Sequence, residues 1–248
     1  MRFTVHFFFA IVAFSFLLTS CSESFTDSRD GQSYDVVKIG GLTWMAENLN
    51  FETAGSFCPE GDSRNCPRLG RLYTWAEARS VCPEGWRLPT KEDFESLVAA
   101  TSEDAAQSLS PSLAQSPSQS LAQSQAGNSG AVPSASNAVQ NNRAGAALKA
   151  SDGWFKKGNG TDDFGFNALP AGYRGAISKA DDGTISGGKF DGIGGYAYFW
   201  SATEDAENRE SNAFYLFLSF SSDVASINAF AKEDYRSVRC VSSRSYSK

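Results

Sequence analysis

Apolar and polar residues alternate, or apolar residues run together at strand length, in several separate stretches of the chain. Such patterns are typical of β-strands that bury one face or both. Near the N-terminus, two of these stretches are joined by Gly40-Gly41, a pair that favours a tight hairpin turn. The pattern predicts strands at residues 34–39, 42–47, 198–202, 213–220, 226–231 and 237–241.

Two helices are predicted in the middle of the chain by their starting signals. Thr74 and Glu77 have the spacing of a capping box, which opens a helix that ends near Val81. Thr90 is a second N-cap residue, and apolar residues follow it at the spacing of one helix face. Those apolar residues are Phe94, Leu97 and Val98. Two short helices and several antiparallel strands make the expected fold class α+β.

Residues 102–142 differ in composition from the rest of the chain. Ser, Ala, Gln, Pro and Asn dominate, and the sequence SLAQS occurs twice. A segment with so few large apolar residues cannot bury enough surface to offset the entropy that it would lose on ordering. We expect a disordered insertion within one domain, with a linker between two domains as the alternative.

The first residues have the order of a secretory signal. An apolar run from Phe7 to Leu18 follows Arg2; it has the length of a signal-peptide core and is short for a membrane-spanning helix. An aliphatic residue and two small residues then precede Cys21, an arrangement that resembles a bacterial lipoprotein signal. The alternatives are an ordinary signal peptide with a chance cysteine and an uncleaved anchor.

The lipoprotein interpretation divides the chain and gives it a location. Residues 1–20 are the predicted signal, and lipid on Cys21 would hold the rest in the cell envelope, at the outer membrane or cell surface. Residues 21–30 are predicted to be a polar tether. Residues 31–244 are predicted to be a single domain that the insertion at 102–142 interrupts.

Charge and histidine content limit the chemistry. The formal charge is −6, and cleavage after residue 20 removes one positive charge and no acid, which leaves about −7. An acidic chain disfavours nucleic acid and anionic lipid as partners. The one histidine is His6, inside the predicted signal. Histidine-based catalysis and histidine-ligated metal sites are therefore excluded from the mature chain.

Four cysteines remain once Cys21 is assigned to lipid, and an even number is typical of disulfides in exported proteins. Three pairings are open. We favour Cys58–Cys66, which closes a loop of turn-forming residues, together with Cys82–Cys240, which ties the helical region to the last predicted strand. A zinc site of four cysteines is the alternative, disfavoured because no CxxC spacing occurs.

Five blocks of sequence carry distinctive motifs: GRLYTWAEA, CPEGWRLPTKEDFESL, LKASDGWFKKGNGTDDFGFNALPAGYR, FWSATE and SVRCV. Together and in this order they resemble the Fibrobacter succinogenes major paralogous domain, over residues 30–242 apart from the insertion. More distantly, GWRLPT followed by an acidic helix resembles the formylglycine-generating enzyme superfamily, whose core is related to the C-type lectin fold.

The resemblance implies a C-type lectin-like domain with two short helices, twisted antiparallel strands and much irregular loop. The enzymes of that superfamily use two redox-active cysteines close together near the C-terminus, where this chain has only Cys240. We therefore carry over no catalytic residue. No cofactor is expected, and calcium is the one candidate.

Two places are candidates for ligand binding. Trp154 lies beside Gly153 and two lysines, and it is the tryptophan that we expect to be exposed enough to stack on a sugar. The other tryptophans are expected in the core: Trp44, Trp75, Trp86 and Trp200. The loop that follows Trp154 offers the side-chain oxygens that a calcium site needs, although turn formation explains the same residues. They belong to Asn159, Thr161, Asp162 and Asp163.

These observations predict a lipid-anchored envelope protein that binds or displays without catalysis. Its expected partners are the membrane, through the lipid, and a polysaccharide or another surface protein, but not nucleic acid. One alternative is an enzyme distantly like the formylglycine-generating oxidases, which needs at least one free thiol near Cys240. The other is a purely structural component of the envelope.

Overall fold

The structure is a strand-rich α+β domain with short helices, as the sequence predicts at the level of fold class. The computed structural model describes residues 23–102 and 143–244, apart from residues 180 and 183. The predicted signal, Cys21 and residues 103–142 of the predicted insertion lie outside the described residues.

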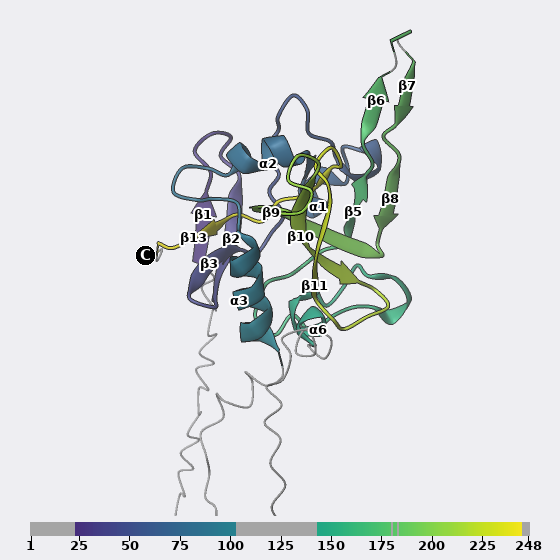
Figure 1. Ribbon diagram of the computed structural model, residues 1–248. Coiled ribbons are helices and arrows are strands. Elements are labelled where there is room, and N and C mark those ends of the chain that lie inside the picture. The colour runs from purple at the N-terminus through teal and green to yellow at the C-terminus, as the bar shows by residue number, and fades with distance from the viewer. Residues whose placement is uncertain (1–22, 103–142, 180, 183, 245–248) are drawn as a thin grey trace, which may run out of the picture.

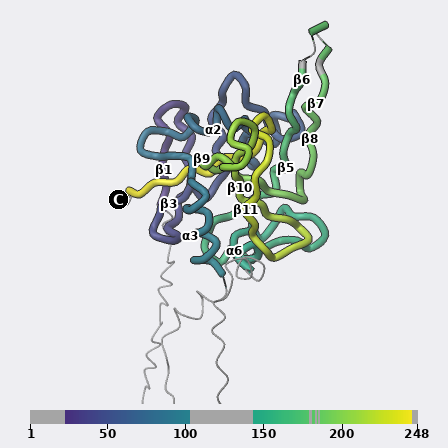
Figure 2. The backbone as a smooth tube through the Cα atoms, in the orientation of Figure 1, coloured from purple at the N-terminus to yellow at the C-terminus, as the bar shows by residue number. Residues whose placement is uncertain are grey.

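The first sheet joins the N-terminal strands to the last strand of the chain. Its strands, in sheet order, are β1 (Glu23–Thr26), β2 (Ser33–Ile39), β3 (Leu42–Met45) and β13 (Val241–Ser242). The predicted hairpin is confirmed: Gly40 and Gly41 connect β2 to β3 with φ angles of 60° and 82°, which residues with a Cβ rarely adopt. Figure 2 shows the purple start and the yellow end of the described chain meeting in this sheet.

The tether expected at residues 21–30 is wrong for the part that the structure describes. Residues 23–26 form β1, which pairs with β2, and Phe25 packs on Trp86 with 5.1 Å between the ring centroids. Asp27 is fully buried, and its carboxylate accepts a 2.6 Å hydrogen bond from Arg29. One aromatic contact and one ion pair thus hold a stretch whose composition is polar, so residues 23–30 belong to the domain.

The second sheet has the order β11-β10-β9-β12-β4. Its strands are β4 (Leu72–Tyr73), β9 (Tyr196–Glu204), β10 (Asn212–Ser219), β11 (Ser226–Ala231) and β12 (Arg236–Ser237). The strands predicted at 198–202, 213–220 and 226–231 are confirmed as β9, β10 and β11.

The strand predicted at residues 237–241 is wrong as a single element. The chain leaves the second sheet after Ser237 and enters the first sheet at Val241, so two short strands replace one. Val238 and Cys240, which lie between them, are fully buried. An apolar run therefore marks a crossing between sheets here, and burial alone does not distinguish the two cases.

Two strand pairs extend the domain beside β9. One pairs β5 (Ala171–Arg174) with β8 (Phe190–Ile193), and the other pairs β6 (Ile177–Lys179) with β7 (Ile185–Gly187). Figure 1 shows the β6–β7 hairpin projecting beyond the rest of the domain, on the side away from the first sheet.

Both predicted helices are confirmed with their caps. In α2 (Trp75–Val81) the Thr74 side chain accepts from the Glu77 amide, and in α3 (Lys91–Thr101) the Thr90 side chain accepts from the Asp93 amide. The shorter elements are α1 (Cys66–Leu69), α6 (Ala144–Leu148) and the 3-10 turns η1 (Pro59–Gly61) and η2 (Phe155–Lys157). No helix in the described residues has the length and apolar character that crossing a membrane requires.

The residues on either side of the predicted insertion return to one core. Phe94 and Leu97 of α3 and Ala144 and Leu148 of α6 belong to the same buried cluster, and Figure 1 shows the two helices at the same end of the domain. Both favoured disulfides are present, Cys58–Cys66 and Cys82–Cys240. The described residues on both sides of the insertion therefore form one domain.

A buried arginine joins the chain segments between the two sheets. The Arg239 guanidinium donates to the carbonyls of Met45 (3.1 Å), Asn167 (2.8 Å) and Phe166, and to the side-chain oxygen of Asn48 (2.9 Å). Burial lowers the pKa of Arg239 to about 9, so the group stays charged at neutral pH. Four acceptors on two distant segments thus converge on one cation, which fixes how those segments meet.

Candidate functional site

Aromatic side chains gather on one face of the second sheet because side chains of a strand point alternately to its two faces. On β9 and β10, Phe199 and Leu216 point into the core, whereas Tyr198 and its cross-strand neighbour Phe217 lie on the opposite face. We call this row the tyrosine band. It comprises Tyr196, Tyr198, Tyr215 and Phe217 of the second sheet together with Tyr173 of β5.

The rings of the tyrosine band contact one another closely. Tyr198 is central, with ring-centroid distances of 5.0 Å to Phe217, 5.3 Å to Tyr173 and 5.7 Å to Tyr215. All five side chains are half-buried, so part of each one reaches solvent. Rings at these separations stabilise one another and hold a fixed surface.

The tyrosine hydroxyls of this band have no hydrogen-bond partner among the described residues. By contrast, the buried Tyr73 hydroxyl donates to the carbonyl of Phe51 at 2.7 Å, and the Tyr34 hydroxyl accepts from the Asn50 amide at 3.1 Å. Burial raises the pKa of Tyr198, and it also raises that of Tyr215. These phenols therefore remain protonated at neutral pH and offer donors as well as acceptors.

A buried arginine lies beneath the band. The Arg236 guanidinium carbon lies 4.3 Å from the ring centroid of Tyr215 and 4.9 Å from those of Tyr198 and Trp200. Its one ion pair is with Asp234 at 2.9 Å, and its Nε has no hydrogen-bond partner among the described residues. Burial lowers the pKa of Arg236, an effect that Asp234 opposes. Cation–π attraction to several rings at once fixes the band over this side chain.

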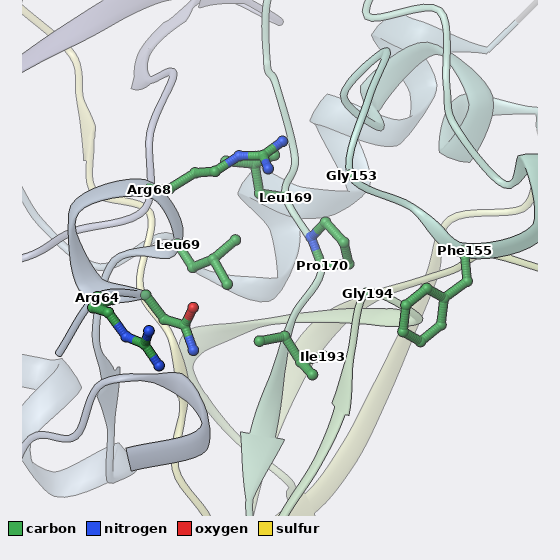
Figure 3. Close-up of a pocket in the computed structure, with 10 residues that line it drawn as sticks. Arg64, Arg68, Leu69, Gly153, Phe155, Leu169, Pro170, Ile193 and Gly194 are labelled. Atoms are coloured by element: carbon green, nitrogen blue, oxygen red, sulfur yellow. The ribbon is translucent and has the colours of Figure 1, made fainter. Parts of the chain in front are cut away.

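A pocket opens at one end of the band, next to the 3-10 turn η2. Its volume is about 360 Å³. Figure 3 shows Arg64 and Arg68 along one side and Phe155 on the other. Between them lie the apolar side chains of Leu69, Leu169, Pro170 and Ile193.

Phe155 is 53% exposed, yet its position is fixed by the backbone beneath it. Its amide donates to the Gly194 carbonyl at 2.7 Å. Its ring lies so close to Gly194 that a Cβ at this position would collide with it. Phe155 and Phe220 both lie against Gly195, and Phe220 is 5.9 Å from Tyr196 between ring centroids. Phe220 therefore lies between Phe155 of the pocket and Tyr196 of the band.

The sequence model described as the Fibrobacter succinogenes major domain matches residues 37–242. The chain belongs to this family. The family is associated with the cell surface and envelope. No curated protein and no solved structure gives a match.

In the structure, Trp154 lies in a different place from the one that we predicted. Trp154 is 6% exposed, and its indole nitrogen donates to the Ala168 carbonyl at 3.1 Å inside the core. The expected exposure of Trp154 is therefore wrong. The neighbouring Phe155 takes the exposed position instead, because the chain turns through η2 at this point. The other tryptophans are buried as predicted.

The side-chain oxygens of the candidate calcium residues make hydrogen bonds within their own loop. The Asn159 side-chain oxygen accepts from the Trp154 amide at 3.0 Å, and an Asp162 oxygen accepts from the Asn167 amide at 2.6 Å. Thr161 donates to Asp163 at 2.7 Å. Burial raises the pKa of Asp162.

No group of three or more His, Cys, Asp or Glu side chains in the described residues is arranged to hold a metal ion. The hydrogen bonds of the loop agree with the turn-forming alternative, and calcium stays a prediction.

The sequence analysis missed the tyrosine band and the pocket. A signal for the band is present, since Tyr196, Tyr198 and Trp200 occupy alternate positions in the strand YAYFWSA. It shows that one face of the strand is aromatic, but not whether another layer covers that face. The pocket has no comparable signal, because Arg68 and Phe155 come from separate segments that meet only in the fold.

Proposed function

We propose that this Fibrobacter succinogenes major domain is a non-catalytic polysaccharide-binding module of the cell envelope, anchored by lipid on Cys21. The observation that carries the proposal is the tyrosine band: half-buried, fixed rings whose hydroxyls have no hydrogen-bond partner among the described residues. The band offers a ligand both ring surface and polar groups, which is the combination that an oligosaccharide requires.

The physical match is between two amphipathic surfaces. A sugar ring presents C–H groups on its faces and hydroxyls around its edge. The C–H groups gain by burial against aromatic carbon, while the hydroxyls need donors and acceptors that replace water. Tyrosine provides both in a side chain that loses little conformational entropy, and here Arg236 and the neighbouring rings already restrict its motion.

Two observations support a function without catalysis. Cys240, near which the enzyme alternative needs a free thiol, is buried and bonded to Cys82. No histidine occurs after His6. A C-type lectin-like architecture is also part of the proposal, supported by the two capped helices α2 and α3 among antiparallel strands.

Binding is tested by titrating soluble xylan, hydroxyethylcellulose and peptidoglycan fragments into protein that starts at Ser22. We expect Tyr198→Ala to weaken the interaction at least tenfold, because it removes the central ring. The matched control is Phe214→Ala, a half-buried aromatic on β10 that faces Lys91 and lies outside the band. Equal loss in both variants, or no binding of any glycan by the unmodified protein, would count against the proposal.

The anchor needs a separate test, because a soluble fragment can bind glycan without it. The mass of the N-terminal peptide from protein extracted from its native membrane should show acyl chains on Cys21. An unmodified thiol at this position would remove the lipid from the proposal and leave the binding function to be judged separately.

A further inference from the structure

The pocket beside η2 has charged groups of one sign only. Among the residues that line it, Arg64 and Arg68 are charged, and no acid lines it. The chain as a whole is acidic, with a formal charge of −6. Each arginine pairs with an acid just outside the pocket, Arg64 with Asp62 and Arg68 with Asp152. An anionic group on a ligand is favoured by the guanidinium donors that these pairs leave unused.

Both arginines have N–H groups that make no hydrogen bond to the described residues. Arg64 binds Asp62 through Nε and Nη2, and Arg68 binds Asp152 through Nη2 alone. Arg64 Nη1, and Nε and Nη1 of Arg68, have no hydrogen-bond partner among the described residues. The pairs are exposed, with 87% of the Arg64 side chain and 57% of the Arg68 side chain accessible. Exposed pairs of this kind contribute little stability, so a ligand can share or replace them at small cost.

The rest of the pocket suits a ring with one apolar face. Phe155 gives an aromatic wall, Leu69 and Ile193 give apolar contact, and Asn65 supplies an amide beside Arg64. The volume of about 360 Å³ lies at the lower end of the range for small-molecule sites. A carboxylate in a fork of guanidinium donors, with its ring against Phe155, would satisfy each of these surfaces.

We propose that this pocket binds the carboxylate of a hexuronate, which makes the module selective for acidic polysaccharides. The inference rests on the proposed polysaccharide function and assigns its ligand class. Phe155, Phe220 and Tyr196 connect the pocket to the tyrosine band, so one chain can place a charged sugar in the pocket and further sugars along the band. The band supplies affinity for the chain, and the pocket supplies the preference for charge.

The backbone segments that form the pocket walls are held in place before any ligand arrives. Arg64 and Asn65 lie inside the loop that the Cys58–Cys66 disulfide closes, and Arg68 lies on the helix that starts at Cys66. On the opposite wall, the Phe155 amide is bonded to the Gly194 carbonyl, and the Phe155 ring lies against Gly194. Walls that are already positioned reduce the entropy lost on binding.

The test compares two polymers with the same backbone and different charge, polygalacturonate and its fully methyl-esterified form. We expect the unmodified protein to bind polygalacturonate at least tenfold more tightly at low salt, with the difference shrinking as salt rises. Arg68→Gln should bring the affinities for the two polymers to within about twofold of each other, because the galacturonate carboxylate loses its guanidinium partner. The control is Arg209→Gln, an exposed arginine that pairs with Glu204 and does not line the pocket. Equal binding of the two polymers by the unmodified protein would overturn the assignment.

A monosaccharide separates failure of the pocket from failure of the band. Free galacturonate, followed by NMR, should bind the unmodified protein and Tyr198→Ala equally, and should not bind Arg68→Gln. If galacturonate binds but no polymer does, the polysaccharide function fails and the pocket assignment stands. If both polymers bind equally, the function stands and the pocket assignment fails. If neither polymer nor monosaccharide binds, both are wrong.

Discussion

Arg236 and Arg239 are three residues apart and both are buried against aromatic rings, but their hydrogen-bond partners differ. Arg239 donates to four oxygens, three of them backbone carbonyls from distant segments. Arg236 has one carboxylate partner and an unpartnered Nε, and aromatic rings surround the rest of its guanidinium. Neither arginine is a plain core residue, because each is charged and costly to bury.

The difference shows how the same residue type serves two purposes. The interactions of Arg239 are all with the frame of the domain, and all of them are made without a ligand. Arg236 interacts mainly with side chains that reach solvent, so it shapes a surface. Arg239 thus serves the frame of the domain, while Arg236 supports the candidate binding face.

The largest effect is expected at the structural arginine. Arg239→Met should lower the free energy of unfolding by about 4 kcal/mol or more, because three carbonyls and an amide oxygen lose their donor inside the protein. Urea denaturation followed by tryptophan fluorescence measures this loss. A decrease below about 1 kcal/mol would mean that the convergence of segments on Arg239 does not stabilise the fold.

Removal of Arg236 should cost less and should depend on pH. We expect Arg236→Met to lose about 3 kcal/mol near pH 7, because Asp234 remains buried without its cation. Burial already raises the pKa of Asp234, and Arg236 opposes this rise. Without Arg236 that pKa rises further, so the folded state holds a proton that the unfolded state releases. The variant should therefore lose stability as the pH increases from about 4 to 7.

A double variant provides the control for Arg236→Met. Asp234→Asn, added to Arg236→Met, removes the buried charge while retaining an acceptor for the Ala176 amide. The double variant should recover more than half of the lost stability and should lose the pH dependence. If the single variant is equally stable at pH 4 and pH 7, the ion pair with Asp234 does not account for the role of Arg236.

The smallest expected change in stability comes from removing single tyrosine hydroxyls. Tyr73→Phe should lower the free energy of unfolding by about 1 kcal/mol, since the hydroxyl donates to a buried carbonyl. Tyr198→Phe removes a hydroxyl without a described partner, so its stability should change by less than about 0.3 kcal/mol while glycan affinity falls severalfold. Urea denaturation and glycan titration of both variants would show that one hydroxyl contributes to stability and the other to binding. A stability loss in Tyr198→Phe equal to that in Tyr73→Phe would contradict this prediction.

The features that the sequence predicted correctly are encoded locally. Gly40-Gly41 requires the φ angles of a tight turn, and Thr74 and Thr90 begin their helices through bonds to residues three positions away. Each signal lies within a few residues of the element that it defines. The disulfide pairing was also predicted, because a short loop between Cys58 and Cys66 leaves only one partner for the other two cysteines.

The features that the sequence did not predict depend on distant partners. The polar segment at 23–26 becomes a strand because β2 offers an edge and Trp86 contacts Phe25. Trp154 and Phe155 are adjacent aromatics, and which of them is buried depends on the turn at Lys156 and Lys157, whose φ angles of 50° and 67° are unusual for lysine. Nothing in the local pattern distinguishes the two rings.

The position of β1 has a consequence for how the protein would sit on a bilayer. Its first residue, Glu23, is two positions after Cys21, and two residues span at most about 7 Å. If that cysteine carries acyl chains, the linker between the membrane and the domain would be very short. The domain would then rest against the lipid headgroups and sample few orientations. Its reach would then be set by the height of the domain itself, and only polymers that come down to the membrane surface could be captured.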